Sequence, residues 1–250
     1  MMKRYIEKWL SEEKESFSGW DFSRLNGRTR EEDTPWDYKK IVLDALQEDM
    51  HLLDMGTGGG EFLLTLGHPY EKTAVTEGWE PNVELCREKL GPLGIRVEQV
   101  LDDTKLPFED GAFDLIINRH EAYDVSEVKR ILKPDGLFIT QQVGGRNNDW
   151  LSSFLIPGHR TEYDEFCLVN EAEKFRTAGF NLLDQQEAFP KMRFYDVGAI
   201  VYYAKVIEWE FPGFSVEKQL ERLVELQKTV EKTGYVESLE HRFLIIAKNR

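Results

Sequence analysis

Residues 51–60 read HLLDMGTGGG, an apolar run that ends in Asp54-Met55 and passes directly into a glycine-rich loop. A short apolar run closed by glycines is typical of a buried strand. Glycine is needed where the backbone bends sharply or approaches a ligand closely. Because ligands bind at the carboxyl edge of a parallel sheet, the stretch predicts a strand, a ligand-binding loop over Gly56–Gly60 and a helix over 62–66.

Strands and helices alternate on both sides of this loop. Further strands are predicted at 73–77, 97–101, 113–118, 137–143, 182–189 and 242–248. Further helices are predicted at 34–47, 81–90, 126–132 and 170–179. The alternation indicates an α/β fold, in which helices cover both faces of a doubly wound, mostly parallel seven-stranded sheet.

Local signals predict where several of these elements begin and end. Thr34 is the predicted N-cap of the helix over 34–47. Asn170 is the predicted cap of a later helix, and Gly179 is its predicted end. The run KPDG at 133–136 predicts a turn before the strand at 137–143.

The composition limits the classes of function. The 250 residues carry 32 Lys+Arg against 46 Asp+Glu, and this net charge of −14 argues against a broad phosphate-binding face. Cys86 and Cys167 are too few for a disulfide framework or a four-cysteine zinc site. The N-terminus lacks the apolar core of a signal peptide, and no stretch approaches the roughly 20 apolar residues that span a bilayer. We therefore expect a cytoplasmic protein without a metal or a membrane contact.

The glycine spacing discriminates between cofactors. A dinucleotide-binding loop has the pattern G-x-G-x-x-G, and its third glycine falls at position 61, which is Glu61 in this sequence. A carboxylate is unfavourable beside a pyrophosphate. The observed G-x-G-x-G, with Asp54 two residues before it, fits a cofactor without phosphate better.

The pattern Asp54-x-Gly56-x-Gly58-x-Gly60 resembles the first motif of the class I S-adenosylmethionine-dependent methyltransferases. Three later stretches resemble that family's acidic end of the second strand, its adenine-binding turn with the fourth strand, and its turn before the fifth strand. They are Val75-Thr76-Glu77, then Asp102-Asp103 with Leu106-Pro107-Phe108 and Phe113-Asp114, and Ile131–Gly136. The resemblance covers about residues 41–145, with weaker similarity at 170–190 and 241–248. It implies S-adenosyl-L-methionine as the cofactor and methyl transfer as the activity.

The resemblance also implies roles for individual residues. Glu77 is expected to hold the ribose hydroxyls, and Trp79 is expected to contact the adenine. Asp102 is expected to accept a hydrogen bond from the adenine amino group, with Asp103 offering its backbone N–H. The residues expected to contact the cofactor are Asp54, Gly56, Thr57, Gly58, Gly60, Glu77, Gly78, Trp79, Asp102, Asp103 and Asn118. The alternative for Glu77 is a solvated acid at a strand end.

The acceptor side carries weaker signals. Asn118 is followed by RHEAY, without the Pro-Pro that family members acting on the amino groups of bases carry there. His120 and Glu121 are the candidate catalytic residues, as a general base or as substrate contacts. The alternative for His120 is a hydrogen-bonded structural histidine. The residues expected to contact the acceptor are Trp36, Tyr38, Arg119, Gln141 and Gln142.

We expect a single methyltransferase domain over residues 1–250. Its parts are an N-terminal helical cover at 1–40, a cofactor-binding core at 41–189, a helical insertion at 190–240 and a final strand at 241–250. The insertion holds an apolar run and an amphipathic helix at 216–233. Because water must be kept from the sulfonium, we expect the cover and the insertion to roof the active site and to select the acceptor.

The leading interpretation is a methyltransferase that acts on a small molecule. An RNA base methyltransferase is the first alternative, although the acidic composition makes nucleic acid an unfavourable partner. The others are a protein that binds S-adenosylmethionine without catalysis and a nicotinamide-dependent reductase. The sequence identifies neither the acceptor nor the oligomeric state.

Overall fold

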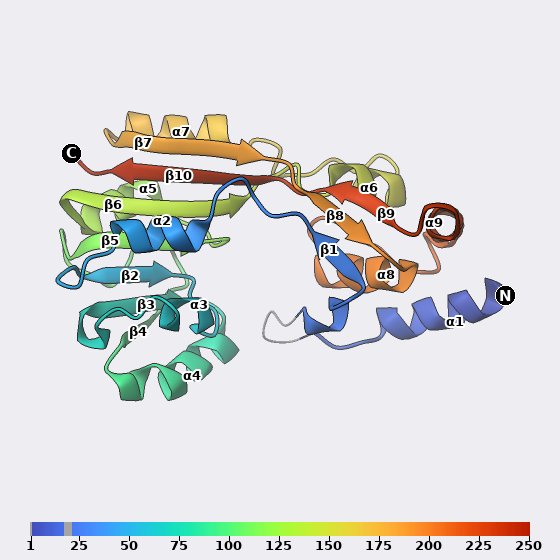
Figure 1. Ribbon diagram of the computed structural model, residues 1–250, viewed down its shortest axis with the longest axis horizontal. Coiled ribbons are helices and arrows are strands. Elements are labelled where there is room, and N and C mark those ends of the chain that lie inside the picture. The colour runs from blue at the N-terminus through green and yellow to red at the C-terminus, as the bar shows by residue number, and fades with distance from the viewer. Residues whose placement is uncertain (1, 18–21) are drawn as a thin grey trace. The chain divides into compact units, whose positions relative to one another are not determined.

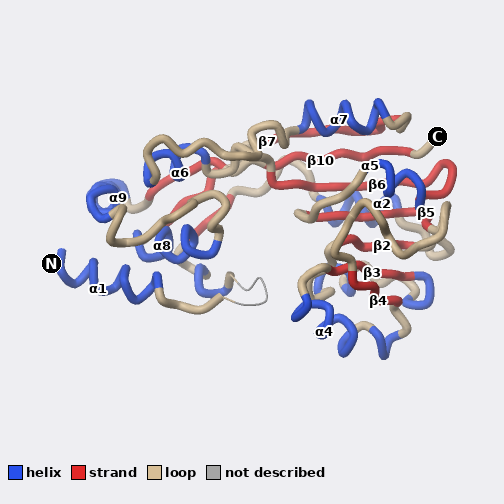
Figure 2. Tube along the Cα trace, turned by 180° about the vertical axis from the view of Figure 1, so that it is seen from behind, coloured by secondary structure: helices blue, strands red, loops and turns tan. Residues whose placement is uncertain are grey.

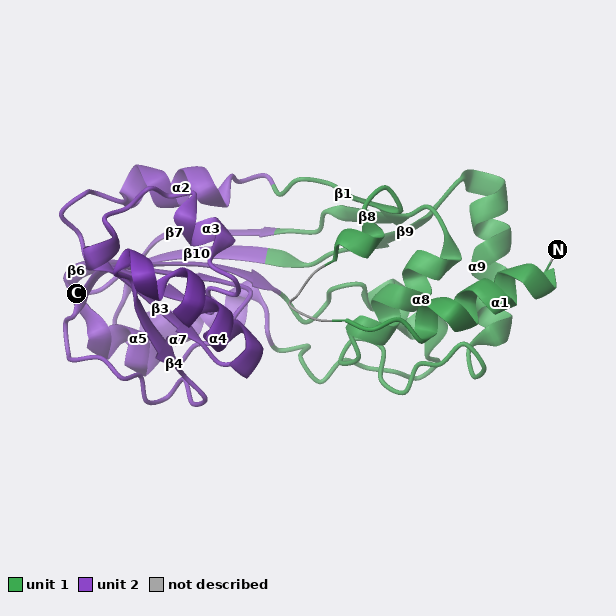
Figure 3. Cartoon of the chain, turned by 90° about the horizontal axis from the view of Figure 1, so that it is seen from below, with its two compact units in different colours: residues 1–34, 144–165, 188–242 green, residues 35–143, 166–187, 243–250 purple. Residues whose placement is uncertain are grey.

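The computed structural model describes residues 2–17 and 22–250 (Figure 1). Contacts within the chain define two compact units, each assembled from separate stretches of sequence (Figure 3). Unit 1 comprises residues 1–34, 144–165 and 188–242, and unit 2 comprises residues 35–143, 166–187 and 243–250. The N-terminal segment up to residue 34 and the insertion at 190–240 therefore belong to the same unit.

Unit 2 is built on a seven-stranded sheet with the strand order β4-β3-β2-β5-β6-β10-β7. The strands are β2 (Leu52–Met55), β3 (Thr73–Glu77), β4 (Arg96–Gln99), β5 (Phe113–Arg119), β6 (Leu132–Val143), β7 (Asn181–Ala188) and β10 (Arg242–Lys248). The five strands from β4 to β6 pair in parallel, whereas the arrow of β10 points opposite to those of its neighbours (Figure 1). The predicted doubly wound, mostly parallel sheet is confirmed.

The strands at the centre of this sheet are covered on both faces. Every residue of β2 and β3 is buried, which explains why these strands read as continuous runs without an exposed polar face. The core of unit 2 joins the sheet to the helices that pack on it. Its members include Ile116, Val128, Phe138, Phe175 and Phe243.

The helices of unit 2 lie close to their predicted positions. They are α2 (Tyr38–Ala45), α3 (Glu61–Leu64), α4 (Glu80–Lys89), α5 (Val125–Ile131) and α7 (Leu168–Thr177), with short 3-10 helices η2 (Tyr70–Lys72) and η3 (Gly91–Leu93). Helices α2 and α3 lie on one face of the sheet, and α5 and α7 lie on the other (Figure 3). Gly179, with φ of 86°, follows the end of α7 as predicted.

Two predicted helix caps are wrong. Asp37 caps α2 in place of Thr34, because its extended backbone directs the carboxylate to the N–H of Lys40 at 3.0 Å. Helix α7 begins after Cys167, so Asn170 lies inside its first turn and does not cap it. In both cases several polar residues stand near the helix start, and only the backbone path decides which of them is the cap.

The predicted turn at 133–136 is a bulge within β6. Phe113 pairs with Leu132, the register then shifts, and Leu115 pairs with Leu137. The residues between the two pairs leave the ladder, and Asp135 among them adopts a positive φ of 67°. Strand β6 therefore begins five residues before the predicted start.

Unit 1 holds a three-stranded antiparallel sheet with the order β1-β8-β9 and several helices (Figure 2). Its elements are α1 (Met2–Glu13), η1 (Ser23–Leu25), β1 (Thr29–Glu31), α6 (Asp149–Leu155), β8 (Lys191–Phe194), α8 (Val197–Val206), α9 (Leu220–Thr233) and β9 (Val236–Leu239). The insertion predicted as helical therefore holds strands as well as helices, because β8 and β9 flank α8 and α9. Their four-residue patterns are too short to be distinguished from loops in the sequence.

The two helices of the insertion account for its apolar residues. The eight residues from Val197 to Ala204 of α8 are all buried, which explains the apolar run. Helix α9 begins at Leu220, four residues later than predicted, and Val216 is buried outside it. Within residues 2–17 and 22–250, no helix combines the length and the apolar character that crossing a bilayer requires.

Candidate functional site

The glycine loop turns tightly at the carboxyl end of β2. The backbone N–H groups of Gly56 and Thr57 donate to Thr76 O at 3.0 and 3.1 Å, which ties the loop to β3. Gly56, Gly58 and Gly60 have φ of 67°, 61° and 76°, a region that side chains with a Cβ adopt only with strain. The glycines selected from the sequence are therefore required by the backbone itself.

Glu77, at the end of β3, organises this loop. One of its carboxylate oxygens accepts a hydrogen bond from the N–H of Gly58 at 2.8 Å, and the other accepts from those of Gly78 and Trp79 at 3.0 and 3.1 Å. Only 6% of the residue is exposed. The alternative of a solvated strand-end acid is therefore wrong, because the carboxylate is buried and bonded to two loops.

Asp54 lies beneath the loop and is 5% exposed. Burial raises the pKa of its carboxyl to about 7 and the charge of Glu77 adds to the rise, while a hydrogen bond from Thr57 and the charge of Arg119 oppose it. The Thr57 hydroxyl donates to this carboxylate at 2.7 Å. The first acid of the motif thus holds the loop from below.

Glu121, which follows β5, lies against the glycine loop. A Cβ added to Gly56 would stand 2.3 Å from its Cγ, so only glycine allows this approach. Burial raises the pKa of Glu121, and the charges of Glu77 and Asp103 raise it further. The fold therefore brings together acids from three loops that are distant in the sequence.

The loop after β4 carries the two adjacent acids. Asp102 is exposed and accepts hydrogen bonds from the N–H and hydroxyl of Thr104 at 3.0 and 2.6 Å, which lower its pKa. Asp103 is half-buried, and its pKa is raised by burial and by the charges of Asp102 and Asp124. Trp79 is 43% exposed, with a face that a ligand can cover.

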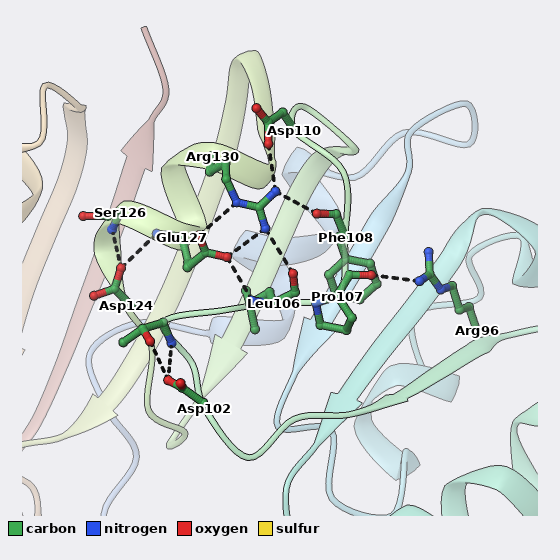
Figure 4. A network of polar contacts seen from close by, with 11 residues as sticks. Arg96, Asp102, Leu106, Pro107, Phe108, Asp110, Asp124, Ser126, Glu127 and Arg130 are labelled. Carbon is green, nitrogen blue, oxygen red and sulfur yellow. Dashed lines mark hydrogen bonds and ion pairs between the residues drawn. The ribbon is translucent and has the colours of Figure 1, made fainter.

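Arg130 of α5 fixes the rest of this loop, as Figure 4 shows. Its guanidinium donates to the carbonyls of Leu106 and Phe108 at 3.1 and 2.7 Å, and it pairs with Glu127 and Asp110 at 2.8 Å each. Glu127 in turn accepts the N–H of Leu106 at 2.9 Å. One arginine therefore anchors the predicted adenine-binding turn to a helix.

A chain of hydrogen bonds joins Trp36, Gln141 and His120. The indole N–H of Trp36 donates to Gln141 Oε1 at 2.7 Å, and Gln141 Nε2 lies 3.2 Å from His120 Nε2. An indole nitrogen only donates, so the amide oxygen faces Trp36 and the amide N–H₂ faces His120. The amide of Gln141 therefore directs its N–H₂ group at His120 Nε2 and links this ring to Trp36.

His120 also has an unusual backbone. Its φ is 62°, a positive value that non-glycine residues seldom adopt, and its N–H donates to Gln141 O at 2.9 Å. Strained residues of this kind cluster at functional sites. Arg119, the residue before it, lies with its guanidinium carbon 4.5 Å from the centre of the Phe62 ring.

Three residues predicted to contact ligands are buried and make hydrogen bonds within the protein. Asn118 accepts from the Thr140 hydroxyl at 2.9 Å and from Gln142 Nε2 at 2.5 Å, and Gln142 also donates to Glu121 O at 3.0 Å. The Tyr38 hydroxyl lies 3.0 Å from Asn118 O, to which it donates. These side chains support the loop of His120 and Glu121 from beneath.

Part of this chain also matches the model of a known protein family. A family model described as a methyltransferase domain matches residues 53–140. Residues 53–140 of this chain therefore resemble a methyltransferase domain.

Individual proteins resemble parts of this methyltransferase domain. The malonyl-[acyl-carrier protein] O-methyltransferase of Geobacter sulfurreducens is 31% identical over 100 residues, which cover 36% of this chain and 38% of that protein. The sterol 4-C-methyltransferase strm-1 of Caenorhabditis elegans is 36% identical over 106 residues, covering 38% and 31%. The chain thus spans about a third of the length of these curated relatives.

The fold of the methyltransferase domain also resembles solved structures. The YcgJ protein of Bacillus subtilis superposes with a TM-score of 0.59 and 18% identity, covering 85% of this chain and 98% of that one. At this identity the likeness supports the fold alone. Among residues 2–17 and 22–250, no group of three or more His, Cys, Asp or Glu side chains is placed to hold a metal ion.

Sequence reasoning missed several residues that shape the methyltransferase domain's loop. The Cys86 thiol donates to Gly58 O at 3.0 Å, and Lys89 Nζ donates to Gly59 O at 3.0 Å. Leu90 lies where a Cβ on Gly60 would collide with it at 2.9 Å. The 3–4 residue spacing of Val83 and Cys86 on α4 and of Leu90 at its C-cap is the signal that marks this face.

Proposed function

We propose that this protein transfers the sulfonium methyl group of S-adenosyl-L-methionine to a small-molecule acceptor. The observation that carries the proposal is a set of four interacting carboxylates beside the glycine loop. They belong to Asp54, Glu77, Asp103 and Glu121. The charge of Glu77 raises the pKa of both Asp54 and Glu121, and the charge of Asp103 adds to the rise at Glu121, so this set of like charges favours a ligand that brings positive charge.

The charge of the cofactor matches this set. S-adenosyl-L-methionine carries a positive sulfonium in addition to its amino-acid zwitterion, whereas a dinucleotide brings a negatively charged pyrophosphate. Glu61, at the start of α3, adds a further acid where a dinucleotide loop has glycine. The electrostatics of the loop therefore support the same cofactor that the motif pattern predicts.

The residues of the loop edge have distinct proposed roles toward the cofactor. A carboxylate has about four lone-pair sites, and three backbone donors already use the Glu77 carboxylate. One site therefore remains for a ribose hydroxyl. Asp102 and the backbone N–H of Asp103 are assigned to the adenine, with Trp79 against its ring. Gly56, Gly58 and Gly60 allow the close approach of the amino-acid end.

The cofactor, when bound, supplies an electrophilic methyl group, so the chain's own task is to align the acceptor and to exclude water. We assign His120 as a contact of the acceptor, because its backbone has a positive φ and its ring is oriented by Gln141. Glu121 is the group that takes a proton from an acceptor that loses one on attack, since it lies against the glycine loop and burial raises its pKa. Trp36 and Gln141 orient His120 and are positioning residues.

A small-molecule acceptor is supported by two observations. The net charge of −14 opposes nucleic-acid binding. The two curated relatives are named for a malonyl-[acyl-carrier protein] and a sterol, neither of which is a nucleic acid. A cytoplasmic location is part of the proposal and is supported by the two free cysteines, Cys86 and Cys167.

The proposal is tested by titration calorimetry followed by a transfer assay. S-adenosylmethionine and S-adenosylhomocysteine should bind, and NAD should not. The protein is then incubated with methyl-labelled S-adenosylmethionine and, separately, the small-molecule and RNA fractions of a cell extract. Label in the small-molecule fraction supports the proposal, and label in RNA alone contradicts the acceptor class. Cofactor binding without transfer to either fraction would identify a binding protein, and binding of NAD alone would overturn the cofactor.

A further inference from the structure

The outer face of the three-stranded sheet in unit 1 carries cations that the proposed methyl transfer does not use. Arg30 on β1 lies directly opposite Arg193 on β8, and Arg193 lies opposite Glu237 on β9. The neighbouring residues Met192 and Phe194 are buried on the inner face. Since side chains alternate along a strand, the two arginines and the glutamate form one row across the outer face.

A small cavity opens on this face. Its volume is about 80 Å³, and it is lined by Arg30, Glu32, Lys191 and Arg193. A water molecule occupies about 30 Å³ in the liquid, so the cavity has room for one small polar group. Three of its four lining residues are cations in a chain whose net charge is −14.

The guanidinium of Arg193 is held in place while part of it stays available. Its Nε donates to Glu237 Oε2 at 2.8 Å, and its central carbon lies 4.7 Å from the centre of the Tyr235 ring. Among the described residues, its two Nη atoms have no protein partner, and the guanidinium of Arg30 makes neither a hydrogen bond nor an ion pair. Two guanidinium groups with unused donors thus face the same cavity.

The register of β1 and β8 places Arg30 directly opposite Arg193, which is unfavourable without a further anion. Residues directly opposite in an antiparallel pair have Cβ atoms about 4.5–5.5 Å apart, and like charges there destabilise the sheet. Glu237 accepts from Arg193 and lies 3.8 Å from Lys191 Nζ, so it serves two cations. The Glu32 carboxylate accepts from the backbone N–H of Lys191 at 3.3 Å and pairs with neither arginine. The cluster therefore has one more cation than it has carboxylates.

We propose that this cavity binds the oxyanion group of a small ligand, either a phosphate or a carboxylate. Arg30 and Arg193 supply paired N–H donors, which match the geometry of such groups, and Lys191 supplies a third positive charge. At about 80 Å³ the cavity has room for the anionic group, and the remainder of a larger ligand extends out of its opening.

Inorganic phosphate and malonate are the two probes for the test. Each is titrated into the full chain by calorimetry at constant ionic strength, and melting temperatures are recorded in the same buffers. Saturable millimolar or tighter binding of either probe is expected, and the responding probe identifies the oxyanion. Arg30→Gln and Arg193→Gln should each weaken that binding at least tenfold. Lys228→Gln removes one exposed charge from α9 of the same unit and should bind like the wild type.

A second readout distinguishes a binding residue from a structural one. Without phosphate or malonate, Arg30→Gln should melt at or above the wild-type temperature, because it relieves the opposition to Arg193. A lower melting temperature would give Arg30 a structural role and overturn the proposal. Absence of saturable binding of both probes, or equal binding by wild type and both arginine variants, would overturn it as well. Neither readout depends on methyl transfer.

Discussion

Replacing Glu77 with alanine should both destabilise the protein and weaken its binding of S-adenosylmethionine. The carboxylate accepts three backbone hydrogen bonds, from Gly58, Gly78 and Trp79. A bond to a charged group contributes about 1.5 kcal/mol at the lower end of its range, and water that enters the space left by the side chain replaces part of it. The loss is therefore about 3 kcal/mol, which corresponds to a fall in melting temperature of roughly 6–12 °C for a chain of this size.

The cofactor should lose affinity for the same reason. Glu77→Ala removes the ribose acceptor and frees the N–H of Gly58, so binding should weaken tenfold or more, about 1.4 kcal/mol. Glu77→Gln keeps one oxygen acceptor and should show about half the thermal effect. Thermal unfolding without cofactor and calorimetry with S-adenosylhomocysteine measure the two effects separately.

Glu84→Gln is the matched control, because Glu84 is exposed on the adjacent helix and its loss changes the charge equally. It should leave both measurements unchanged. If Glu77→Ala melts at the wild-type temperature, the three hydrogen bonds do not hold the loops and the structural reasoning fails. If the variant is destabilised but binds the cofactor normally, Glu77 is structural only and does not hold the ribose.

Three further predictions address the loop, its buried acid and its anchor. Gly56→Ala should cost more stability than Gly58→Ala in denaturant unfolding, since both have positive φ but only the first meets the Cβ and Cγ of Glu121, at 2.4 and 2.3 Å. Adding Glu121→Gly, which removes both atoms, should remove the difference, and a persistent difference would contradict the clash. The pKa of Asp54, raised by burial to about 7, means that the folded state holds its proton more tightly than the unfolded chain. Stability on the order of 4 kcal/mol, present below about pH 4, is therefore lost as the pH rises through 7. Asp54→Asn should flatten the dependence of the unfolding free energy on pH. An unchanged dependence would refute the assignment of this titration to Asp54. In Arg130→Lys, the lysine cannot make the paired bonds to Glu127 and the two loop carbonyls. The variant should therefore lower cofactor affinity several-fold and the melting temperature by a few degrees. Unchanged affinity would show that the loop forms without this anchor.

The central sheet and its loop were predictable from the sequence because their signals are local. The buried run at 52–55 and the glycines after it can form little other than a strand and a tight turn, since three of the glycines adopt positive φ. The acid ending β3 was also predictable. The low exposure of Glu77 was not predictable, because its burial depends on the loop of Gly58, nineteen residues earlier, which donates a hydrogen bond to it.

The roles of the residues after β5 depended on neighbours in space. Asn118 and Gln142 look like ligand contacts in the sequence, yet they bond to each other and lie beneath the site. The surroundings of the His120 ring include Gln141, which is bonded to Trp36, and both residues are distant from His120 in the sequence. Two statements about the site stay predictions. The first is that these residues contact the cofactor, and the second is that the N-terminal segment and the insertion roof the site.

The sequence by itself determined the elements whose patterns are long or stereochemically constrained: the parallel strands, the glycine loop, the helices of unit 2 and the apolar run of α8. Tertiary structure alone decided the pairing of β1, β8 and β9, whose three or four residues carry no readable period. It also decided which acids converge at the loop and which arginines face one another. Hydrophobic period is a property of neighbouring residues, whereas charge proximity and hydrogen-bond partners arise only when distant segments are brought together.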